Sequence, residues 1–312
     1  MRSFEILCDV SFDMNHELRE RFGIYDDYVR SDLICPDGKV LEANTEWTNL
    51  DPKSYFESMR KNKTLYKSAV RGVEEFIKTM DKPLSEGHDI LCVALSSDMS
   101  ATYSLFMQAK EELSKKYPER KIFVVDSLRY STAEGMLAVY AAKLRDEGKT
   151  IEETAKWLED NKHRFHQMGP LDDLFFLAKA GRISMAKAFF GSLIGIMPMG
   201  DFNRSGRTTI LGRAKGTKNA LKATVEYIKA TIENPEDQVI FIAHTNREDK
   251  ALKLKEMIEQ EIKCKEVIVS MVGMVCGANI GPGLVAAYYV GKEISENNEG
   301  ETKIMKGILD NL

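Results

Sequence analysis

The sequence has 312 residues, 43% of them hydrophobic and 29% charged, which is typical of a globular protein with substantial cores. Its 44 Lys and Arg and 48 Asp and Glu residues give a net charge of −4, too small to indicate nucleic acid or an anionic membrane surface as a partner. The five cysteines are odd in number without CxxC spacing, and no apolar run approaches the ~20 residues of a membrane span, so we expect a cytoplasmic protein without disulfides, a zinc site or stable membrane insertion.

The first half of the chain alternates predicted strands with predicted helices. FEILCDV is a short buried strand that ends at Asp9, and DILCVAL and KIFVVDS are two further strands. SAVRGVEEFIKTM, QAKEELSKKY and TAEGMLAVYAAKLRDEG predict helices, and TIEETAKWLEDNKHRF predicts a helix with Thr150 and Glu153 as a capping box. Residues 31–61 are loop-like, with a turn signal at CPDGK. This alternation predicts a parallel sheet flanked by helices, in which ligands bind at the carboxyl ends of the strands.

The character of the sequence changes after about His166, and we expect a domain boundary near residue 165. DDLFFLAKAGRISMAKAFFGSLIGIMPMG is apolar and interrupted by glycines, and TTILGRAKGTKNALKATVEYIKATI predicts a strand, a turn and a helix. QVIFIAH, REDKALKLKEMIEQEI and EVIVSMVG predict strand, helix and strand, and GANIGPGLVAAYYVGK predicts a Gly-Pro-Gly turn into a last strand. We therefore expect one domain over residues 1–165 and a second over 166–312, which ends in a polar linker and a short terminal helix.

Hydroxyl side chains crowd the turn LSSDMSATYSLF at residues 95–106, where Ser96, Ser97, Ser100 and Thr102 lie close together. The turn joins a predicted strand to a predicted helix, and helix N-termini favour anions through their N–H groups and dipole. The turn is therefore a candidate anion site, with simple capping of the helix by its serines as the alternative. Arg182, in the segment AGRIS, is the cation that we pair with this anion, with a surface salt bridge as its alternative role.

The motifs of common catalytic sites are missing from the sequence. It contains no GxxxxGK[ST] or GxGxxG phosphate loop, and the hydroxyl turn lacks the glycines of a GxSxG nucleophile elbow. The histidines form no HxxxH or HExxH pattern; a solvated pair is the simpler interpretation of His163 and His166. His244 ends a predicted strand and is either functional or a satisfied core histidine. We therefore predict no catalytic residue, no metal and no cofactor.

The order of these segments closely resembles the DegV family, bacterial proteins that bind one long-chain fatty acid. CDVS is similar to the family's opening Asp-Ser-Thr strand, with Asp9 kept, and SSDMSATY is similar to SSxLSGTY, with Ala101 where Gly is usual. VVDS, LFFLAKAGRI with the later Pro198, and FIAH with His244 follow in the family's order. GANIGPG corresponds to the family's Gly-x-His-x-Gly-Pro-Gly, and the matches extend from about residue 5 to residue 292.

The resemblance implies a fold of two α/β domains. The first is expected to have three layers around a parallel sheet, and the second to have two layers around a mixed sheet. The carboxylate of the ligand is expected between the domains, and the acyl chain in the second domain. The residues that the resemblance assigns to the carboxylate are Thr64, Ser96 or Ser97, Arg182 and Asn279.

The resemblance also implies that the protein is not an enzyme by itself but the substrate-binding subunit of a fatty-acid kinase. A separate dihydroxyacetone-kinase-like subunit is expected to hold ATP and phosphorylate the bound fatty acid, and the acyl phosphate then feeds phospholipid synthesis. A chain without a phosphate loop fits this division of labour. The basic residues that we assign to docking of the kinase, with a solvated face as the alternative, are Arg204, Arg207, Arg213 and Lys215.

Burying ~15 methylenes contributes on the order of 12 kcal/mol to binding before the costs of association. An acyl chain gains this free energy only inside a closed apolar tunnel. DDLFFLAK and AFFGSLIGIMPM have this composition, with ordinary core as the alternative, and their methionines adapt well to a flexible chain. The residues that we assign to the acyl-chain pocket are Phe189, Phe190, Leu193, Ile194, Ile196 and Met197.

Two departures from the family pattern affect the head-group residues. The family's Thr-Ser-Gln-Pro motif is reduced to KTLYKS, which keeps Thr64, and the family His that contacts the carboxylate corresponds to Asn279. If the lost residues shape the face that binds the kinase, a lipid carrier or sensor without a kinase partner is the alternative function. A stand-alone enzyme with Ser97 as nucleophile and His244 as base is a third hypothesis, which nothing in the spacing supports.

Overall fold

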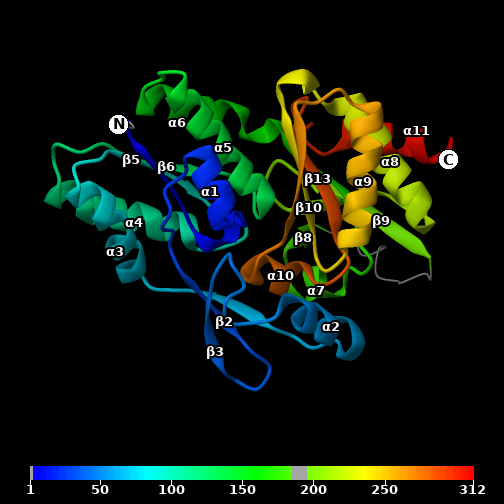
Figure 1. Cartoon of the computed structure of the whole chain (residues 1–312), viewed down its shortest axis with the longest axis horizontal. Helices are drawn as coiled ribbons and strands as arrows, with labels where there is room; N and C mark the ends of the chain where they lie inside the picture. The colour runs from blue at the N-terminus through cyan, green and yellow to red at the C-terminus, as the bar shows by residue number, and fades with distance from the viewer. Residues whose placement is uncertain (1–2, 185–194) are drawn as a thin grey trace. The chain divides into compact units, whose positions relative to one another are not determined.

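The computed structural model describes residues 3–184 and 195–312, and the chain divides into two compact units (Figure 1). The first unit comprises Met1–Asn49, Tyr66–Lys162 and Gly273–Cys276, and the second comprises Leu50–Leu65, His163–Val272 and Gly277–Leu312. The passage at residues 162 to 163 lies near the boundary expected at 165. Contacts nevertheless group Leu50–Leu65 with the second unit, because rings of Tyr55 and Phe56 pack against Gly277.

The helices and strands of the described residues are as follows. The strands are β1 (Glu5–Cys8), β2 (Ser31–Ile34), β3 (Val40–Ala43), β4 (Lys67–Val70), β5 (Ile90–Ala94), β6 (Ile122–Asp126), β7 (Phe165–Pro170), β8 (Ile183–Ser184), β9 (Ile196–Phe202), β10 (Thr208–Lys215), β11 (Val239–His244), β12 (Glu266–Met271) and β13 (Val285–Val290). The helices are α1 (His16–Phe22), α2 (Pro52–Asn62), α3 (Val73–Ser85), α4 (Thr102–Lys116), α5 (Thr132–Asp146), α6 (Ile151–Asn161), α7 (Phe175–Ala180), α8 (Gly216–Thr231), α9 (Glu248–Glu261), α10 (Met274–Ile280) and α11 (Glu299–Leu309).

A parallel sheet with the strand order β1-β5-β6 forms the centre of the first unit. Its strands are short apolar runs, as expected for a parallel sheet that is covered on both faces. Helices α3 and α4 cover one face, where Phe76 and Phe106 meet edge to face at 4.8 Å, and α5 and α6 cover the other (Figure 1). The predicted three-layer arrangement is confirmed, and the carboxyl ends of the three strands lie at one edge of this sheet.

A second sheet of the first unit, with the order β3-β2-β4, is antiparallel and was not predicted. The expectation that residues 31–61 are loop-like is wrong, because they contain β2, β3 and α2. The three strands, SDLI, VLEA and KSAV, are short and half-exposed, so they carry little of the apolar pattern that marks a strand.

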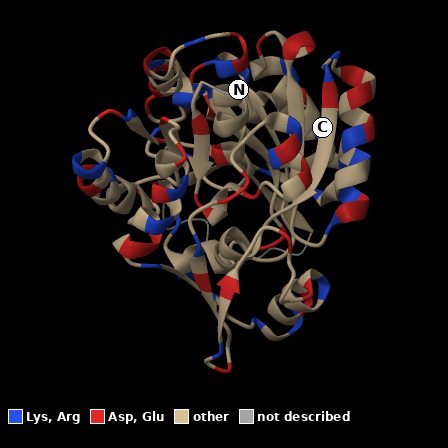
Figure 2. Ribbon diagram, turned by 60° about the vertical axis from the view of Figure 1, so that its left-hand side comes forward, with Lys and Arg blue, Asp and Glu red and all other residues tan. Residues whose placement is uncertain are grey.

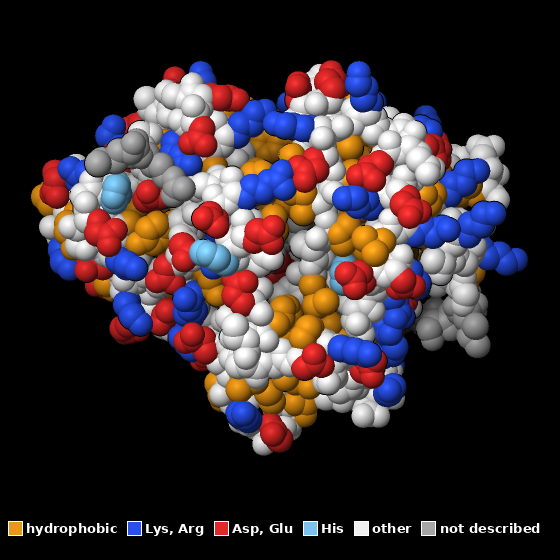
Figure 3. Space-filling view, in the orientation of Figure 1, with side chains coloured by type: hydrophobic (Ala, Val, Ile, Leu, Met, Phe, Trp, Pro, Cys, Tyr) orange, Lys and Arg blue, Asp and Glu red, His pale blue; other side chains and the backbone are white. Residues whose placement is uncertain are grey.

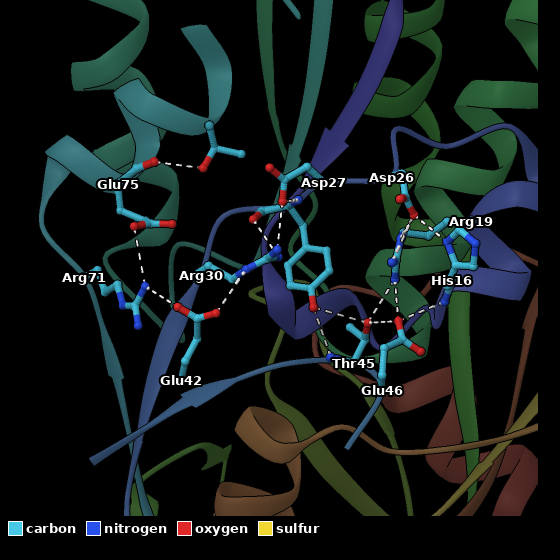
Figure 4. Close-up of polar contacts among 12 residues, drawn as sticks. His16, Arg19, Asp26, Asp27, Arg30, Glu42, Thr45, Glu46, Arg71 and Glu75 are labelled. Atoms are coloured by element: carbon cyan, nitrogen blue, oxygen red, sulfur yellow. Dashed lines mark hydrogen bonds and ion pairs between the residues drawn. The ribbon is translucent and has the colours of Figure 1, made fainter. Parts of the chain in front are cut away.

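Ion pairs tie this antiparallel sheet together (Figure 4). Arg71, directly after β4, donates to Asp32 in β2 at 2.7 Å and to Glu42 in β3 at 2.9 Å. In the same unit Arg19 of α1 donates through Nη1 to Thr45 Oγ1 at 2.9 Å, which fixes the chain after β3 (Figure 4). Charged side chains therefore provide part of the stabilisation that buried apolar side chains provide in the parallel sheet.

The second unit is built on a mixed sheet with the strand order β12-β11-β13-β7-β9-β10-β8. Helices α8, α9 and α11 pack against its strands, which confirms the predicted two-layer mixed-sheet domain (Figure 1). The C-terminal helix, expected only as a short tail, is part of the core: Met305 is fully buried. A Cβ atom at Gly212 in β10 would lie 2.6 Å from Leu309, so α11 lies directly on that strand.

The end of α6 differs from the prediction. The capping box of Thr150 and Glu153 is confirmed, but the helix ends at Asn161 and the chain enters β7 at Phe165. His166 is consequently buried in β7, where its Nδ1 lies 2.6 Å from Asp201 Oδ2 and its Nε2 lies 2.7 Å from a carbonyl oxygen. The expectation of a solvated histidine pair is therefore wrong for this residue.

Positive and negative side chains are interleaved over the surface. Figure 2 shows Lys and Arg alternating with Asp and Glu along the outer helices, and the face drawn in Figure 3 is mixed in the same way. This pattern agrees with the small net charge of −4. Within residues 3–184 and 195–312, no helix is long and apolar enough to cross a membrane.

Candidate functional site

The hydroxyl turn follows β5 at the carboxyl edge of the parallel sheet, and protein acceptors hold its backbone. Leu95 N donates to Asp9 Oδ2 at 3.0 Å, Ser96 N to the carbonyl oxygen of Arg129 at 2.9 Å, and Ser97 N to Asp126 Oδ1 at 3.1 Å. These three N–H groups are therefore already used within the first unit. A carboxylate bound at this turn would depend on hydroxyl donors more than on the backbone donors that the sequence suggested.

The two adjacent serines have different surroundings. Ser96 is fully buried, and its Oγ accepts a hydrogen bond from Asp98 N at 3.3 Å. Ser97 is exposed, and its hydroxyl makes no hydrogen bond with any residue that the structure describes. Neither serine caps α4, which begins at Thr102 with Ala101 as its N-cap. Of the two serines, Ser97 is the one whose hydroxyl can reach a ligand.

Carboxyl groups gather at the end of β1, beside this turn. Asp9, Asp13 and Glu134 are all buried, and Ser11 Oγ lies 2.9 Å from Glu134 Oε2 and also contacts Asp9 Oδ1. Burial raises the pKa of Asp13 to about 7, although the hydroxyl of Ser131 opposes the shift by donating to its carboxylate. Burial also raises the pKa of Glu134 well above its ordinary value, and the charge of Asp9 adds to the effect.

Glu134 is a residue that the sequence analysis missed. It lies in the first turn of α5, a position where an acid normally complements the helix dipole at the surface. The signal available in the sequence was its neighbour Gly135, where a Cβ would lie 2.6 Å from the carbonyl oxygen of Phe12. That close approach brings the start of α5 against the segment after β1.

In the second unit, three segments meet at the ring of Phe176: α7 itself, the chain around Lys63 and the chain around Gly281. Lys63 Nζ lies 5.7 Å from the centre of this ring, and a Cβ at Gly281 would lie 2.3 Å from its Cδ2 atom. Lys63 directly precedes Thr64, and Gly281 follows Asn279 by two residues. The structure thus brings the segments that carry Thr64 and Asn279 against α7.

Arg182 belongs to the same group of segments, because it follows α7 and its C-cap Gly181 directly. The Arg182 side chain is exposed, and its Nη1 donates to the carbonyl oxygen of Ala180. Thr64 and Asn279 are both half-buried, and Asn279 lies near the end of α10 rather than in a turn. The predicted Gly-Pro-Gly turn follows α10 from Gly281 and leads into β13, as expected.

Further charges lie around these segments. Lys63, which the sequence analysis did not single out, forms an ion pair with Asp173, and Arg247 forms an ion pair with Asp172. A Cβ at Gly283 would lie 2.4 Å from the Asp172 side chain, so the Gly-Pro-Gly turn packs on this pair. In the sequence, the signal for Lys63 was its position immediately before Thr64.

The predicted acyl-chain pocket is described only in part. Ile196 and Met197 begin β9, where Ile196 is half-buried and Met197 is 7% exposed in the core of the second unit. That core also contains Met168, Met199 and Met305. The other residues assigned to the pocket lie outside the described residues: Phe189, Phe190, Leu193 and Ile194.

His244 is placed at the end of β11 and is buried. Its Nδ1 accepts a hydrogen bond from Arg247 N at 3.2 Å, and burial lowers its pKa below the ordinary value. This geometry matches the expectation of a satisfied core histidine. Over residues 3–184 and 195–312, no group of three or more His, Cys, Asp or Glu side chains has an arrangement that could hold a metal ion.

The chain matches a known protein family over most of its length. A family model described as "Uncharacterised protein, DegV family" matches residues 3–292. A DegV domain-containing protein of Clostridium perfringens is 32% identical over 291 residues, which is 93% of this chain and 98% of the relative.

Two solved structures have the same fold. A DegV family protein from Thermus thermophilus, described by its fatty acid binding, superimposes with a TM-score of 0.82 and 25% identity over 93% of this chain and 100% of its own. DegV from Bacillus subtilis, described as a fatty acid binding protein, has a TM-score of 0.76 and 24% identity over 94% of this chain and 100% of its own.

Proposed function

Because the chain belongs to the DegV family, we propose that it binds one long-chain fatty acid and holds the carboxylate with Thr64, Ser97, Arg182 and Asn279. The observation that carries the proposal is the meeting of three segments around Phe176, which gathers the surroundings of Thr64, Arg182 and Asn279 in the second unit. Fatty acid binding by the relatives from Thermus thermophilus and Bacillus subtilis supports the same ligand class.

The chemistry of these side chains suits a carboxylate. Thr64, Ser97 and Asn279 supply neutral hydrogen-bond donors, and Arg182 supplies a charge that pH does not remove, with donors in a fork that matches two oxygens. The hydroxyl groups of Thr64 and Ser97 make no hydrogen bond with the described part of the chain, so they are available to a ligand. Lys63 lies directly before Thr64, but its charge is paired with that of Asp173.

The acyl chain is assigned to the second unit. Its core is rich in methionine, a side chain that adapts to a flexible chain, and Met197 is part of this core, with the half-buried Ile196 next to it in β9. Each buried methylene contributes about 0.8 kcal/mol, so chain length sets most of the affinity. Fatty acids shortened by several methylenes should bind progressively more weakly.

We further propose that the protein presents the fatty acid to a separate ATP-binding kinase subunit, which forms the acyl phosphate. The basic residues Arg213 and Lys215 in β10 are partly or fully exposed and are candidates for docking that subunit. Arg204 pairs with Glu293 at 2.7 Å, and Arg207 donates to the carbonyl oxygen of Gly181.

A reconstitution with a dihydroxyacetone-kinase-like subunit and ATP tests this division of labour. We expect acyl phosphate only when both proteins are present. Acyl phosphate made by this chain alone would contradict the proposal. Fatty acid binding with no partner that forms acyl phosphate would favour a lipid carrier or sensor, an alternative suggested by the reduced motif KTLYKS.

A further inference from the structure

A buried chain of hydrogen bonds holds the turn that carries Ser97. Asp9 Oδ2 accepts from Leu95 N at 3.0 Å, and Asp9 Oδ1 accepts from the backbone N–H of Ser11 at 3.1 Å and from its hydroxyl. Ser11 Oγ also lies 2.9 Å from Glu134 Oε2. The chain therefore connects Glu134 in α5, through Ser11 and Asp9, to the backbone of the turn.

Counting the protons in this chain of hydrogen bonds shows which carboxyl group is ionised. The hydroxyl of Ser11 has one proton but contacts two carboxyl groups, so at least one carboxyl must also carry a proton. Burial raises the pKa of Asp9, but Asp9 accepts from two backbone N–H groups and one hydroxyl, which oppose this shift and favour ionisation of Asp9 over that of Glu134. Glu134 has no such set, and its Oε1 is buried without a hydrogen-bond partner among the described residues. A protonated Glu134 that donates to Ser11, which donates to an ionised Asp9, satisfies these contacts.

The surroundings of the two carboxyl groups also favour a state in which only one of them is ionised. Both carboxyl groups are buried, and the charge on one disfavours ionisation of the other. No lysine or arginine of the described chain forms an ion pair with either of them within 4.0 Å. The other titratable or charged groups near the chain are Cys8, Asp13, Cys276 and, beside Cys8, Arg19.

We propose that Asp9 is a positioning residue for the turn that carries Ser97, and that Glu134 holds the proton that leaves Asp9 free to act as an acceptor. The inference rests on the proposed function, which assigns Ser97 to the ligand carboxylate. Asp9 fixes Leu95 N on one side of the turn, and Asp126 fixes Ser97 N on the other. The two carboxylates thus orient the hydroxyl of Ser97 without contacting the ligand themselves.

Infrared spectroscopy of the full chain at about pH 9 tests where the proton lies, because Asp13, whose pKa is about 7, is ionised there. We expect the carbonyl stretch of a buried protonated carboxylic acid. Glu134→Gln should remove this band, whereas Glu147→Gln, an exposed substitution after the same helix, should leave it. A band that survives Glu134→Gln would overturn the assignment.

Titration of oleic acid into delipidated variants tests the positioning role. Asn at position 9 accepts through one oxygen only, so we expect Asp9→Asn to bind on the order of tenfold more weakly. Glu134→Leu should weaken binding similarly, whereas Glu134→Gln should restore it because its amide donates to Ser11. If Asp9→Asn does not fold, the comparison of Leu with Gln at position 134 provides the same test.

Ser97→Ala separates failure of the inference from failure of the proposed function. If Ser97→Ala weakens binding while Asp9→Asn and Glu134→Leu bind like the unmutated protein, the positioning role is wrong and the head-group assignment stands. If Ser97→Ala binds as tightly as the unmutated protein, the head-group assignment itself is wrong.

Discussion

Arg182 is the residue on which the electrostatics of the proposed head-group site depend. Its side chain is exposed and donates to a backbone carbonyl oxygen, so it contributes little to the packing of the second unit. A fatty acid carboxylate removed from water without a cation or several donors is costly. We therefore expect Arg182 to matter to binding far more than to folding.

We expect Arg182→Ala to weaken fatty acid binding by about 2 kcal/mol, roughly thirtyfold, because a hydrogen bond to a charged group contributes about 1.5–3 kcal/mol. Isothermal titration of oleic acid into the delipidated variant measures the loss. The melting temperature of the delipidated protein should stay unchanged. Arg21→Ala, an exposed substitution in the first unit, is the matched control and should leave affinity unaltered.

Individual side chains of the site differ in how well the sequence predicts them. The hydroxyl turn and Arg182 follow from their neighbours in the chain, because strand, turn and helix signals are local. The roles of Glu134 and Lys63 depend on contacts with Ser11 and Phe176, which are far away in the sequence. In the sequence, only the neighbouring residues Gly135 and Thr64 marked Glu134 and Lys63, so their contacts emerged from the structure.

At the scale of helices and strands, the sequence predicted the strands of the sheet that helices cover on both faces, and missed the strands that are largely exposed. DILCVAL became β5, which is fully buried, and KIFVVDS became β6, which is partly buried, because parallel strands covered by helices are continuous apolar runs. The sheet β3-β2-β4 was missed because its short strands expose much of their surface and depend on ion pairs such as Arg71 with Asp32. His166 was misplaced because the polar end of α6 continues into β7 without a proline or glycine.

The contact of Gly281 with α7 allows a test at this scale. Gly281 has a φ of +80°, and a Cβ there would overlap the ring of Phe176, whereas Gly148 has a φ of +87° and open space around it. Gly148→Ala should cost about 1 kcal/mol of unfolding free energy from backbone strain alone. Gly281→Ala should cost about 1–3 kcal/mol more, because the ring or the turn must move.

Urea titration of the two variants measures this difference. Since Gly281 lies beside the segment of Asn279, Gly281→Ala should also weaken fatty acid binding, whereas Gly148→Ala should not. Equal stability of the two variants would mean that the Gly-Pro-Gly turn does not pack on Phe176 as described.

For the whole molecule, buried carboxyl groups make stability depend on pH. Asp13 and Glu134 both have pKa values raised by burial, so the folded protein holds protons that the unfolded chain releases. Their contribution to stability is fully present below the pKa of the unfolded carboxyls, near ~4. It is lost as pH rises through the folded pKa of Asp13, about 7.

We therefore expect the unfolding free energy to fall by a few kcal/mol, on the order of 1.4 kcal/mol per unit of pKa shift, as pH rises from about 4 to about 7. Asp13→Asn should reduce this dependence to the part that Glu134 contributes, because an amide does not titrate. Asp37→Asn, in the exposed turn between β2 and β3, should retain it. Denaturant titrations at several pH values measure the slopes, and an unchanged slope in Asp13→Asn would contradict the burial argument.

The central claim for the whole molecule is that it carries one long-chain fatty acid. Native mass spectrometry of the protein purified from a bacterial host, followed by denaturation in the same instrument, tests this claim most directly. We predict a folded species heavier than the chain by the mass of a single long-chain fatty acid, which is released on unfolding and recovered when oleic acid is added to delipidated protein. A folded protein that has no excess mass, and that gains none from added oleic acid, would contradict the account.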